Sequence, residues 1–211
     1  MQGADGATWT IVVAAGRGSR FGSAKQFERV AGRRVLDWSV AAARSVSAGI
    51  VLVVPPEVGS AEEPTVESTV VGGVTRSASV RAGLAAVPRE ATVVLVHDAA
   101  RPLASPDLFA LVVAAVQAGA DAVVPAVPVV DALRSRAGRP VDRDQLVAVQ
   151  TPQGFRADAL RAAHVGSPEA TDDAALVEAA GGRLVIVAGE RTNLKITERT
   201  DLVLAAALLE T

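Results

Sequence analysis

The chain alternates short runs of branched apolar residues with longer stretches in which apolar positions recur at helical spacing. Runs of Val, Ile and Leu without a polar face are typical of strands that are buried on both sides, and Ala-rich stretches are typical of helices. Strands are predicted at 10–14, 50–54, 66–71, 92–96, 122–127 and 184–187. Helices are predicted at 35–47, 77–87, 106–118, 158–163, 172–180 and 198–209. This alternation predicts an α/β fold with a mostly parallel, doubly wound sheet that carries helices on both faces.

One segment, residues 128–150, departs from this alternation. Two extended stretches, 129–136 and 145–150, flank the turn-rich sequence Ala137-Gly138-Arg139-Pro140. A hairpin with little core of its own is unstable alone and usually packs on another subunit. We therefore expect a single domain over residues 1–211, with a β-arm at about 129–150 that projects from the sheet and mediates dimerisation.

Composition narrows the class of protein. Of the 211 residues, 50% are hydrophobic and 21% are charged, and the formal net charge is −2. A chain this long and apolar buries a core, and the lack of a basic excess argues against binding to nucleic acid or to a membrane surface. The absence of cysteine excludes disulfides, thiolate catalysis and cysteine-ligated metals. No stretch has the pattern of a signal peptide or a spanning helix, so we expect a cytoplasmic protein.

A glycine-rich loop follows the first predicted strand. It reads Ala14-Ala15-Gly16-Arg17-Gly18-Ser19-Arg20, and Lys25-Gln26 comes shortly after it. Glycines let backbone N–H groups turn toward a phosphate, and open α/β sheets bind ligands at this edge. The basic side chains in and after the loop suit a polyphosphate. The spacing matches neither the dinucleotide-binding fingerprint nor a Walker loop, and a plain turn between strand and helix is the alternative.

Further polar clusters fall at other strand ends and helix starts. Asp98 follows the strand at 92–96, where a carboxylate in a phosphate site is well placed to hold Mg²⁺; a helix cap or an ion pair with Arg101 is the alternative. Thr171 precedes a predicted helix, and for this residue a capping role is favoured over a ligand role. His97 is expected to be structural rather than a general base.

Lysine is rare in this chain. Only two of the 21 basic residues are lysines, Lys25 and Lys195. Either these two positions kept lysine by chance, or they require a compact ammonium group that a guanidinium cannot replace.

Together and in this order, these clusters resemble one family, the 2-C-methyl-D-erythritol 4-phosphate cytidylyltransferases. The matching segments span nearly the whole chain: A-A-G-x-G-x-R at 14–20, K-Q at 25–26, G-G-x-x-R-x-x-S-V at 72–80, H-D-A-A-R-P at 97–102, V-D-R at 141–143, T-P-Q at 151–153, T-D-[DE]-A at 171–174 and N-x-K-[IV]-T at 193–197. The resemblance implies a Rossmann-like sheet of the nucleotidyltransferase type and a homodimer. It also implies transfer of the cytidylyl group of CTP to methylerythritol phosphate, with release of pyrophosphate and with Mg²⁺ or another divalent cation as cofactor.

The resemblance also implies roles for individual residues. Arg20 and Lys25 would lie along the triphosphate, and Lys25 and Lys195 would contact the α-phosphate in the transition state. Asp98 would serve the metal, and Arg143 would reach the acceptor phosphate bound by the neighbouring subunit. The remaining candidates are the nucleotide-binding residues Ala14, Ala15, Gly16, Gly18, Gly73, Arg76 and Ser79, and the acceptor-binding residues Arg101, Asp131 and Thr171.

The implied chemistry agrees with these residue types. A phosphate monoester has a second pKa of about 6, so the acceptor is largely ionised at neutral pH and needs no general base. The obstacle is the repulsion between two anions, which cations that converge on one phosphorus offset. Because both lysines fall on matched catalytic positions, their retention favours a functional interpretation.

Two departures from the family pattern are visible. Ala24 stands where the family usually has proline before the K-Q pair, which loosens the loop more than it changes its chemistry. The D-T pair of the family's arm is Asp131-Ala132 here, so a hydroxyl that contacts the acceptor phosphate is lost. The nearest alternative function is therefore cytidylyl transfer to another polyol phosphate, such as ribitol 5-phosphate. A non-catalytic CTP-binding protein and a nicotinamide oxidoreductase are more distant alternatives, and the glycine spacing argues against the latter.

Overall fold

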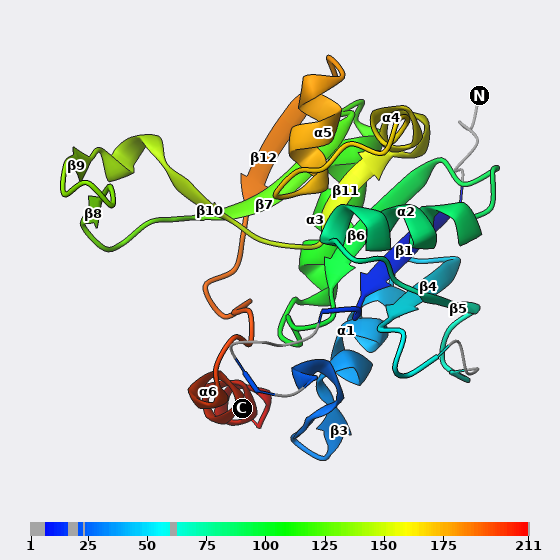
Figure 1. Cartoon of the computed structure of the whole chain (residues 1–211), viewed down its shortest axis with the longest axis horizontal. Coiled ribbons are helices and arrows are strands. Elements are labelled where there is room, and N and C mark those ends of the chain that lie inside the picture. Colours follow the sequence, from blue (N-terminus) through cyan, green and yellow to red (C-terminus); the bar gives the residue numbers. More distant parts are fainter. Residues whose placement is uncertain (1–6, 17–20, 23, 60–62, 211) are drawn as a thin grey trace.

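The computed structural model describes residues 7–16, 21–22, 24–59 and 63–210. A central eight-stranded sheet positions everything else (Figure 1). Its strands are β1 (Thr8–Val13), β4 (Gly49–Val54), β5 (Ser68–Val71), β6 (Val93–Asp98), β7 (Ala122–Pro128), β10 (Val147–Val149), β11 (Gln153–Arg156) and β12 (Leu184–Ala188). Hydrogen bonds order them β10-β7-β11-β6-β1-β4-β5, and β12 pairs with β7.

Strand direction confirms the predicted mostly parallel sheet. β1 runs parallel to β4 and β6, β4 runs parallel to β5, and β12 runs parallel to β7. Only β10 and β11 are antiparallel to their neighbours. The sequence pattern did not reveal β11, because its four residues include a glycine and two polar side chains.

Helices cover both faces of the sheet because successive strand residues point to opposite sides. Val12 and Leu52 face a core that includes α1 (Val35–Arg44) and α3 (Pro106–Gln117). Ile11 and Val53 face the other core, which includes α2 (Arg76–Ala86), α4 (Ala157–Ala163) and α5 (Asp173–Ala179). Each predicted helix and strand is present, with ends that differ from the prediction by at most three residues.

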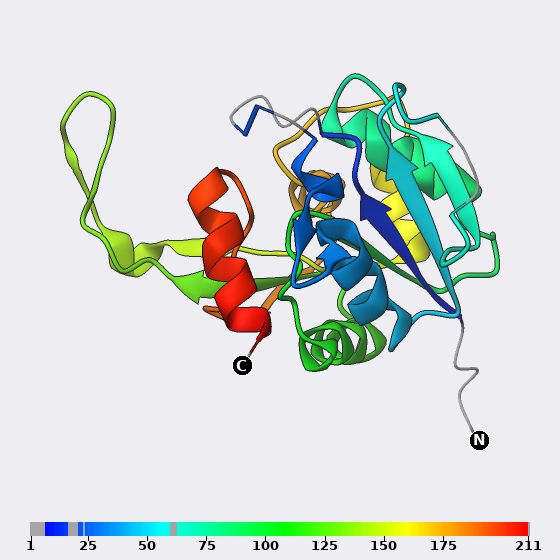
Figure 2. The same ribbon diagram turned by 90° about the horizontal axis from the view of Figure 1, so that it is seen from below.

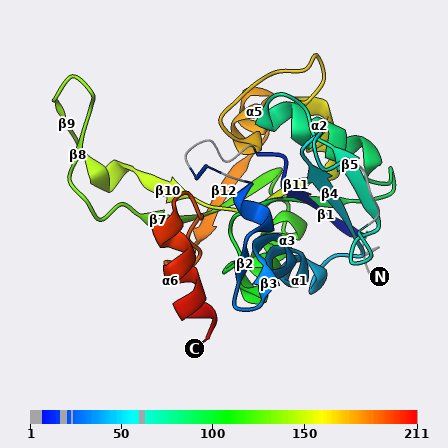
Figure 3. The same cartoon turned by 60° about the horizontal axis from the view of Figure 1, so that its bottom comes forward.

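The last helix, α6 (Arg199–Leu209), lies outside the sheet on the same side of the molecule as the arm (Figures 2 and 3). It belongs to a small apolar cluster that includes Phe21, Ile196 and Ala205, and it contacts a hairpin of β2 (Arg29–Val30) and β3 (Arg33–Arg34). The sequence pattern missed this hairpin, whose strands are two residues long. Within the described residues, no helix is long and apolar enough to cross a membrane.

The arm has a different hairpin from the predicted one. The paired strands are β8 (Leu133–Arg134) and β9 (Pro140–Val141), and a short 3-10 helix, η2 (Arg143–Gln145), follows them. The second predicted stretch, 145–150, does not pair within the arm, because its residues 147–149 join the central sheet as β10 against β7. The arm therefore extends well away from the sheet, as Figure 1 shows.

The position of α3 depends on a glycine in β11. A β-carbon on Gly154 would lie 2.4 Å from Cγ1 of Val112 and 3.0 Å from Cγ2 of Val116, both in α3.

We predict that Gly154→Ala lowers the free energy of unfolding by about 1–3 kcal/mol through overpacking. Urea unfolding of Gly154→Ala, Val112→Ala and the double variant measures this. The double variant should lose less than the sum of the two single losses, because Val112→Ala removes the clashing methyl. Simple additivity would contradict the steric explanation.

Candidate active site

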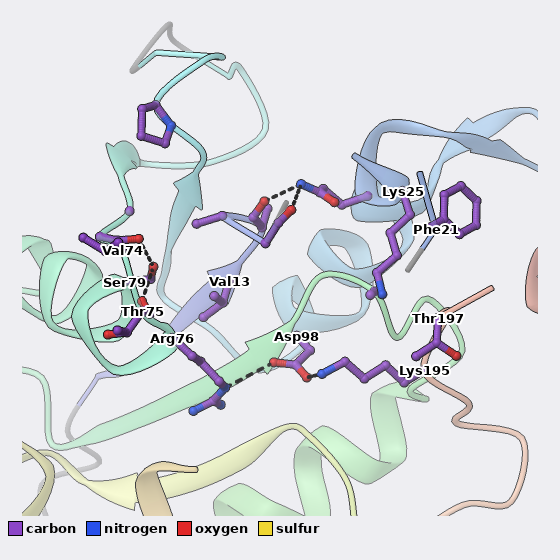
Figure 4. Close-up of a pocket in the computed structure, with 18 residues that line it drawn as sticks. Val13, Phe21, Lys25, Val74, Thr75, Arg76, Ser79, Asp98, Lys195 and Thr197 are labelled. Atoms are coloured by element: carbon purple, nitrogen blue, oxygen red, sulfur yellow. Dashed lines mark hydrogen bonds and ion pairs between the residues drawn. The ribbon is translucent and has the colours of Figure 1, made fainter. Parts of the chain in front are cut away.

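A cleft of about 610 Å³ opens at the carboxyl ends of the parallel strands (Figure 4). Its walls come from the segment after β1, the segment after β5, the end of β6 and the segment before α6. The lining residues are Val13, Ala14, Ala15, Gly16, Phe21, Lys25, Gln26, Pro56, Gly72, Gly73, Val74, Thr75, Arg76, Ser79, Asp98, Ala100, Lys195 and Thr197. This is the edge of the sheet at which α/β folds of this kind bind ligands.

A buried glutamine fixes the loop after β1. Gln26 is 3% exposed, and its Nε2 donates to the carbonyl oxygens of Ala14 at 2.6 Å and Gly16 at 3.1 Å. It lies in a 3-10 helix, η1 (Lys25–Phe27), so the same contact fixes the backbone beside Lys25. The lysine is therefore attached to the loop that would cradle a phosphate.

A glycine brings the opposite wall close to that loop. A β-carbon on Gly72 would lie 2.4 Å from Cβ of Ala15 and 2.8 Å from Oγ of Ser79, so no larger residue fits. Thr75 then caps α2 by accepting a hydrogen bond from the N–H of Ala78 at 3.0 Å. Ser79 Oγ donates to the carbonyl oxygen of Thr75 at 2.9 Å. Together these contacts fix the first turn of α2 at the cleft, with Arg76 on it.

Charged side chains form a row along the cleft (Figure 4). Oδ2 of Asp98 lies 2.6 Å from Nζ of Lys195, and its Oδ1 lies 3.7 Å from Nε of Arg76. Burial raises the pKa of Asp98, but the charges of Lys195 and Arg76 outweigh burial and hold that pKa well below its usual range. Burial lowers the pKa of Arg76, but the charges of Asp173 and Asp98 raise it above its ordinary value. Both groups are therefore ionised at neutral pH.

The segment that carries Lys195 has no regular secondary structure, and buried polar contacts hold it. Asn193 is fully buried, and its Nδ2 donates to the carbonyl oxygen of Thr151 at 3.0 Å. The Arg101 guanidinium donates to the carbonyl oxygen of Asn193 at 2.7 Å, and the N–H of Ile196 donates to that of Ala100 at 2.8 Å. These contacts attach the lysine to the turn after β6 and to the turn before β11.

His97 is fully buried beneath Asp98. Its Nδ1 lies 3.1 Å from Oγ1 of Thr151, and its Nε2 lies 3.3 Å from the carbonyl oxygen of Arg101. Oγ1 of Thr151 accepts the N–H of Asp98, so its own proton is available for Nδ1, and a neutral ring protonated at Nε2 satisfies every partner. Burial lowers the pKa of His97 to about 4. At neutral pH the ring therefore holds the strand end in place and carries no charge.

Most of the predicted site residues meet in this cleft: Ala14, Ala15, Gly16, Lys25, Gly73, Arg76, Ser79, Asp98 and Lys195. Gly18 and Arg20 lie outside the described residues. Four candidates do not line the cleft. Arg101 lies behind the Lys195 segment, where its guanidinium donates to main-chain oxygens. Asp131 and Arg143 lie on the arm, and Thr171 is exposed before α5.

A helix capped by Thr171 would begin at Asp172, but α5 begins at Asp173. Asp172 is the cap, and it accepts a hydrogen bond from the N–H of Ala175 at 3.0 Å. The hydroxyl of Thr171 is thus not needed to start the helix, and its role as an acceptor ligand stays a prediction.

The sequence patterns did not single out four polar residues that support the site: Gln26, Thr151, Asp173 and Asn193. Each lies inside a motif that is visible in the sequence. No spacing rule shows that such side chains are buried, although burial is what makes their hydrogen bonds strong enough to position a loop.

A divalent cation fits this cleft only together with a bound anion. Among the residues that the structure describes, no group of three or more potential ligands lies together. Asp98 is the one carboxylate among the described lining residues. Mg²⁺ is commonly held by one or two carboxylates plus substrate phosphates and water, which agrees with this donor set.

The fold and the cleft define the class: a nucleotidyltransferase-like α/β protein in which the segment after β1 and the cations Lys25, Arg76 and Lys195 line a cavity of about 610 Å³. The model of one family, described as IspD: 2-C-methyl-D-erythritol 4-phosphate cytidylyltransferase, matches residues 8–211. The chain belongs to this family.

Individual relatives agree with the family match. A 2-C-methyl-D-erythritol 4-phosphate cytidylyltransferase from Nocardia farcinica is 47% identical, over 98% of this chain and 95% of the relative. A bifunctional enzyme IspD/IspF from Dinoroseobacter shibae is 48% identical over 95% of this chain, which spans only 53% of that relative. The crystal structure of the cytidylyltransferase from Thermus thermophilus has a TM-score of 0.83 and 42% identity, and covers 98% of this chain and 100% of its own. The chain thus spans about half the length of the bifunctional relative and nearly all of the two others.

The burial of His97 predicts acid sensitivity. The unfolded ring has an ordinary pKa near 6.5, whereas the pKa of the folded ring is about 4. Between these values the unfolded state binds more protons, so stability falls as the pH drops from about 6.5 to about 4, by about 3 kcal/mol from this residue. Urea unfolding from pH 7 to pH 4 should show a flatter stability profile for His97→Gln than for the wild type. Parallel profiles would contradict the assignment.

Proposed function

We propose that the chain transfers the cytidylyl group of CTP to 2-C-methyl-D-erythritol 4-phosphate and releases pyrophosphate. The observation that carries this proposal is the convergence of Lys25, Asp98 and Lys195 on one cleft beside the loop after β1, in a chain of this family. In the non-mevalonate route to isoprenoids, this reaction supplies 4-diphosphocytidyl-2-C-methyl-D-erythritol.

The nucleotide binds along the cleft from α2 toward Lys195. The main-chain groups of Ala15 and Gly73 and the hydroxyl oxygen of Ser79 suit a cytosine ring, because they lie at fixed positions between closely packed walls. Ala14 lines the same end of the cleft, where its N–H is bonded to the carbonyl oxygen of Val53 at 2.7 Å. The triphosphate then follows the loop after β1 toward Lys25. Arg76 adds a cation at the nucleotide end of the row.

The transfer is an in-line displacement. An oxygen of the acceptor's phosphate attacks the α-phosphorus of CTP, a new P–O bond forms, and the bond to the bridging oxygen breaks, so that pyrophosphate leaves with that electron pair. No general base is required, because the attacking phosphate is already ionised. Lys25 and Lys195 stabilise the charge that develops on the equatorial oxygens. The 2.6 Å contact with Asp98 orients Lys195 before substrate arrives.

Asp98 suits a second task, which is to hold Mg²⁺ together with the phosphates of CTP. When bound, the ion supplies charge neutralisation between the two anions. The pKa of Asp98, held well below its usual range, keeps this carboxylate ionised for that purpose.

The acceptor is the least constrained part of the proposal. Ala132 stands in the arm where the family has a threonine, and it is exposed. A missing hydrogen bond to a charged phosphate costs about 1.5–3 kcal/mol. Cytidylyl transfer to another polyol phosphate, such as ribitol 5-phosphate, is therefore the second candidate function.

Pyrophosphate release from CTP and Mg²⁺ tests this function, with methylerythritol phosphate and ribitol 5-phosphate compared as acceptors. We expect release with methylerythritol phosphate, and we expect Lys25→Ala and Lys195→Ala each to lower kcat roughly 100-fold or more while the fold is kept. Arg89→Ala, an exposed change outside the cleft, is the control and should retain wild-type rates. Release with ribitol 5-phosphate alone would change the substrate and leave the mechanism. Full activity in either lysine variant would remove that lysine from the mechanism.

The arm fits a homodimer, in which each arm packs on the partner subunit. Its exposed apolar side chains are Val130, Val141 and Leu146, which are 58%, 38% and 39% exposed, and β10 at its base adds Val147 and Val149, which are 45% and 39% exposed. Because Arg143 does not line the cleft of its own chain, we place it at the acceptor phosphate of the partner's cleft. We further place the enzyme in the cytoplasm, since a chain without cysteine suits a reducing compartment.

Mixed dimers distinguish a residue that acts in the partner's cleft from one that acts in its own. Arg143→Ala and Lys195→Ala should each be nearly inactive alone. After the two variants are unfolded and refolded together, half of the dimers carry both chains, and one of their two clefts has Lys195 and the partner's arm intact. Activity should therefore return to about a quarter of the wild-type value. No recovery, with mixed dimers demonstrated by differential tagging, would place Arg143 in its own cleft.

A further inference from the structure

A second carboxylate lies behind the wall of the cleft. Asp173, the first residue of α5, is fully buried and does not line the cavity. Its Oδ2 accepts a hydrogen bond from Nη1 of Arg76 at 2.6 Å, and its Oδ1 lies 3.0 Å from Nε2 of His164. A carboxylate only accepts, so Nε2 of His164 carries the proton and donates it. Both oxygens of Asp173 are thus engaged.

Arg76 therefore lies between two carboxylates that compete for it. Its contact with Asp173 is a charge-assisted hydrogen bond, whereas the 3.7 Å from its Nε to Oδ1 of Asp98 is too long for one. Asp98 instead has its hydrogen-bonded ion pair with Lys195, at 2.6 Å. The guanidinium of Arg76 is therefore hydrogen-bonded to Asp173 behind the wall of the cleft, and a gap separates it from Asp98.

That gap is small enough to close. A movement of about 1 Å would bring Nε of Arg76 to the usual hydrogen-bond distance from Asp98. A planar guanidinium with two parallel donors binds a carboxylate more specifically than an ammonium group does. An Arg76 released from Asp173 would then occupy Asp98 and weaken its hold on Lys195.

We propose that Asp173 is a positioning residue for the reaction: it draws Arg76 away from Asp98, so that Asp98 stays available to orient Lys195. His164, at the end of α4, fixes Asp173 by the second hydrogen bond. This inference rests on the proposed function for its kinetic consequence, but its structural consequence is independent of any substrate.

A double-mutant cycle tests the proposal. Asp173→Asn keeps the shape and removes the charge, and we expect kcat to fall roughly 10- to 100-fold, as is common when the partner of a functional side chain is changed. Because the loss acts through Arg76, Asp173→Asn should cost almost nothing further when Arg76 is already Gln. Asp173→Glu, which keeps the charge, should restore most of the activity. Multiplicative losses in the double variant would overturn the proposal, as would full kcat in a folded Asp173→Asn protein.

A crystal structure of Asp173→Asn without substrate keeps this inference separate from the proposed function. We expect Arg76 within hydrogen-bond distance of Asp98, and an unmoved Arg76 would refute the positioning role even if the enzyme proved to use another acceptor. Thermal unfolding of each variant identifies a merely structural effect, which would lower Tm without changing kcat per folded molecule.

If Asp173→Asn does not fold, His164→Gln takes its place in the same cycle. It loosens Asp173 without removing its charge, and it should give a smaller loss that again disappears beside Arg76→Gln.

Discussion

The cleft is organised around one ion pair, between Asp98 at the end of β6 and Lys195 before α6. A carboxylate that is 9% exposed is costly to keep charged unless cations and hydrogen bonds compensate it. The fold meets this requirement with residues that are 97 positions apart in the sequence. Strand β6 is central, so its end is fixed by neighbours on both sides, and the flexible lysine is oriented from this rigid point. The ion pair thus matters less for stability than for fixing the position of the Lys195 ammonium group in the cleft.

Buried hydrogen bonds elsewhere in the site fix the backbone that carries this ion pair. Lysine side chains are mobile, and the segment around Lys195 has no helix or strand to restrict it. Hydrogen bonds to main-chain oxygens restrict this segment instead: Asn193 donates to Thr151, and the Arg101 guanidinium donates to Asn193. Neutral His97 in turn contacts the hydroxyl of Thr151 and fixes that residue. On the other side of the cleft, Gln26 does the same for Lys25. Each of the two lysines therefore has its own buried amide or guanidinium group that positions the backbone beside it.

The sequence predicts the sheet and its helices well, because Val-rich strands and Ala-rich helices differ clearly in period and composition. It misses β11 and the β2–β3 hairpin, where four-residue and two-residue strands are too short to show a period. It also places 145–150 within the arm hairpin, because local pattern does not reveal that β7, from the other end of the arm, is the better partner. At the site, motifs find the residues that would touch a ligand. They do not find Asp173, because its function depends on which arginine the fold places beside it.

The distribution of charge concentrates cations in the cleft. The formal net charge is −2, so long-range attraction does not draw polyanions to the molecule as a whole. Within the described lining of the cleft, however, Lys25, Arg76 and Lys195 face a single carboxylate. Confined between closely packed walls, this local excess of cations suits a polyphosphate small enough to enter. Selection by a small cationic cleft on a slightly acidic protein agrees with a free nucleoside triphosphate as the substrate. The same reasoning applies to Arg76, which is ion-paired with Asp173 and therefore does not hydrogen-bond to Asp98. Arg76 still adds positive charge to the cleft, while Asp98 keeps its ion pair with Lys195 and orients that lysine.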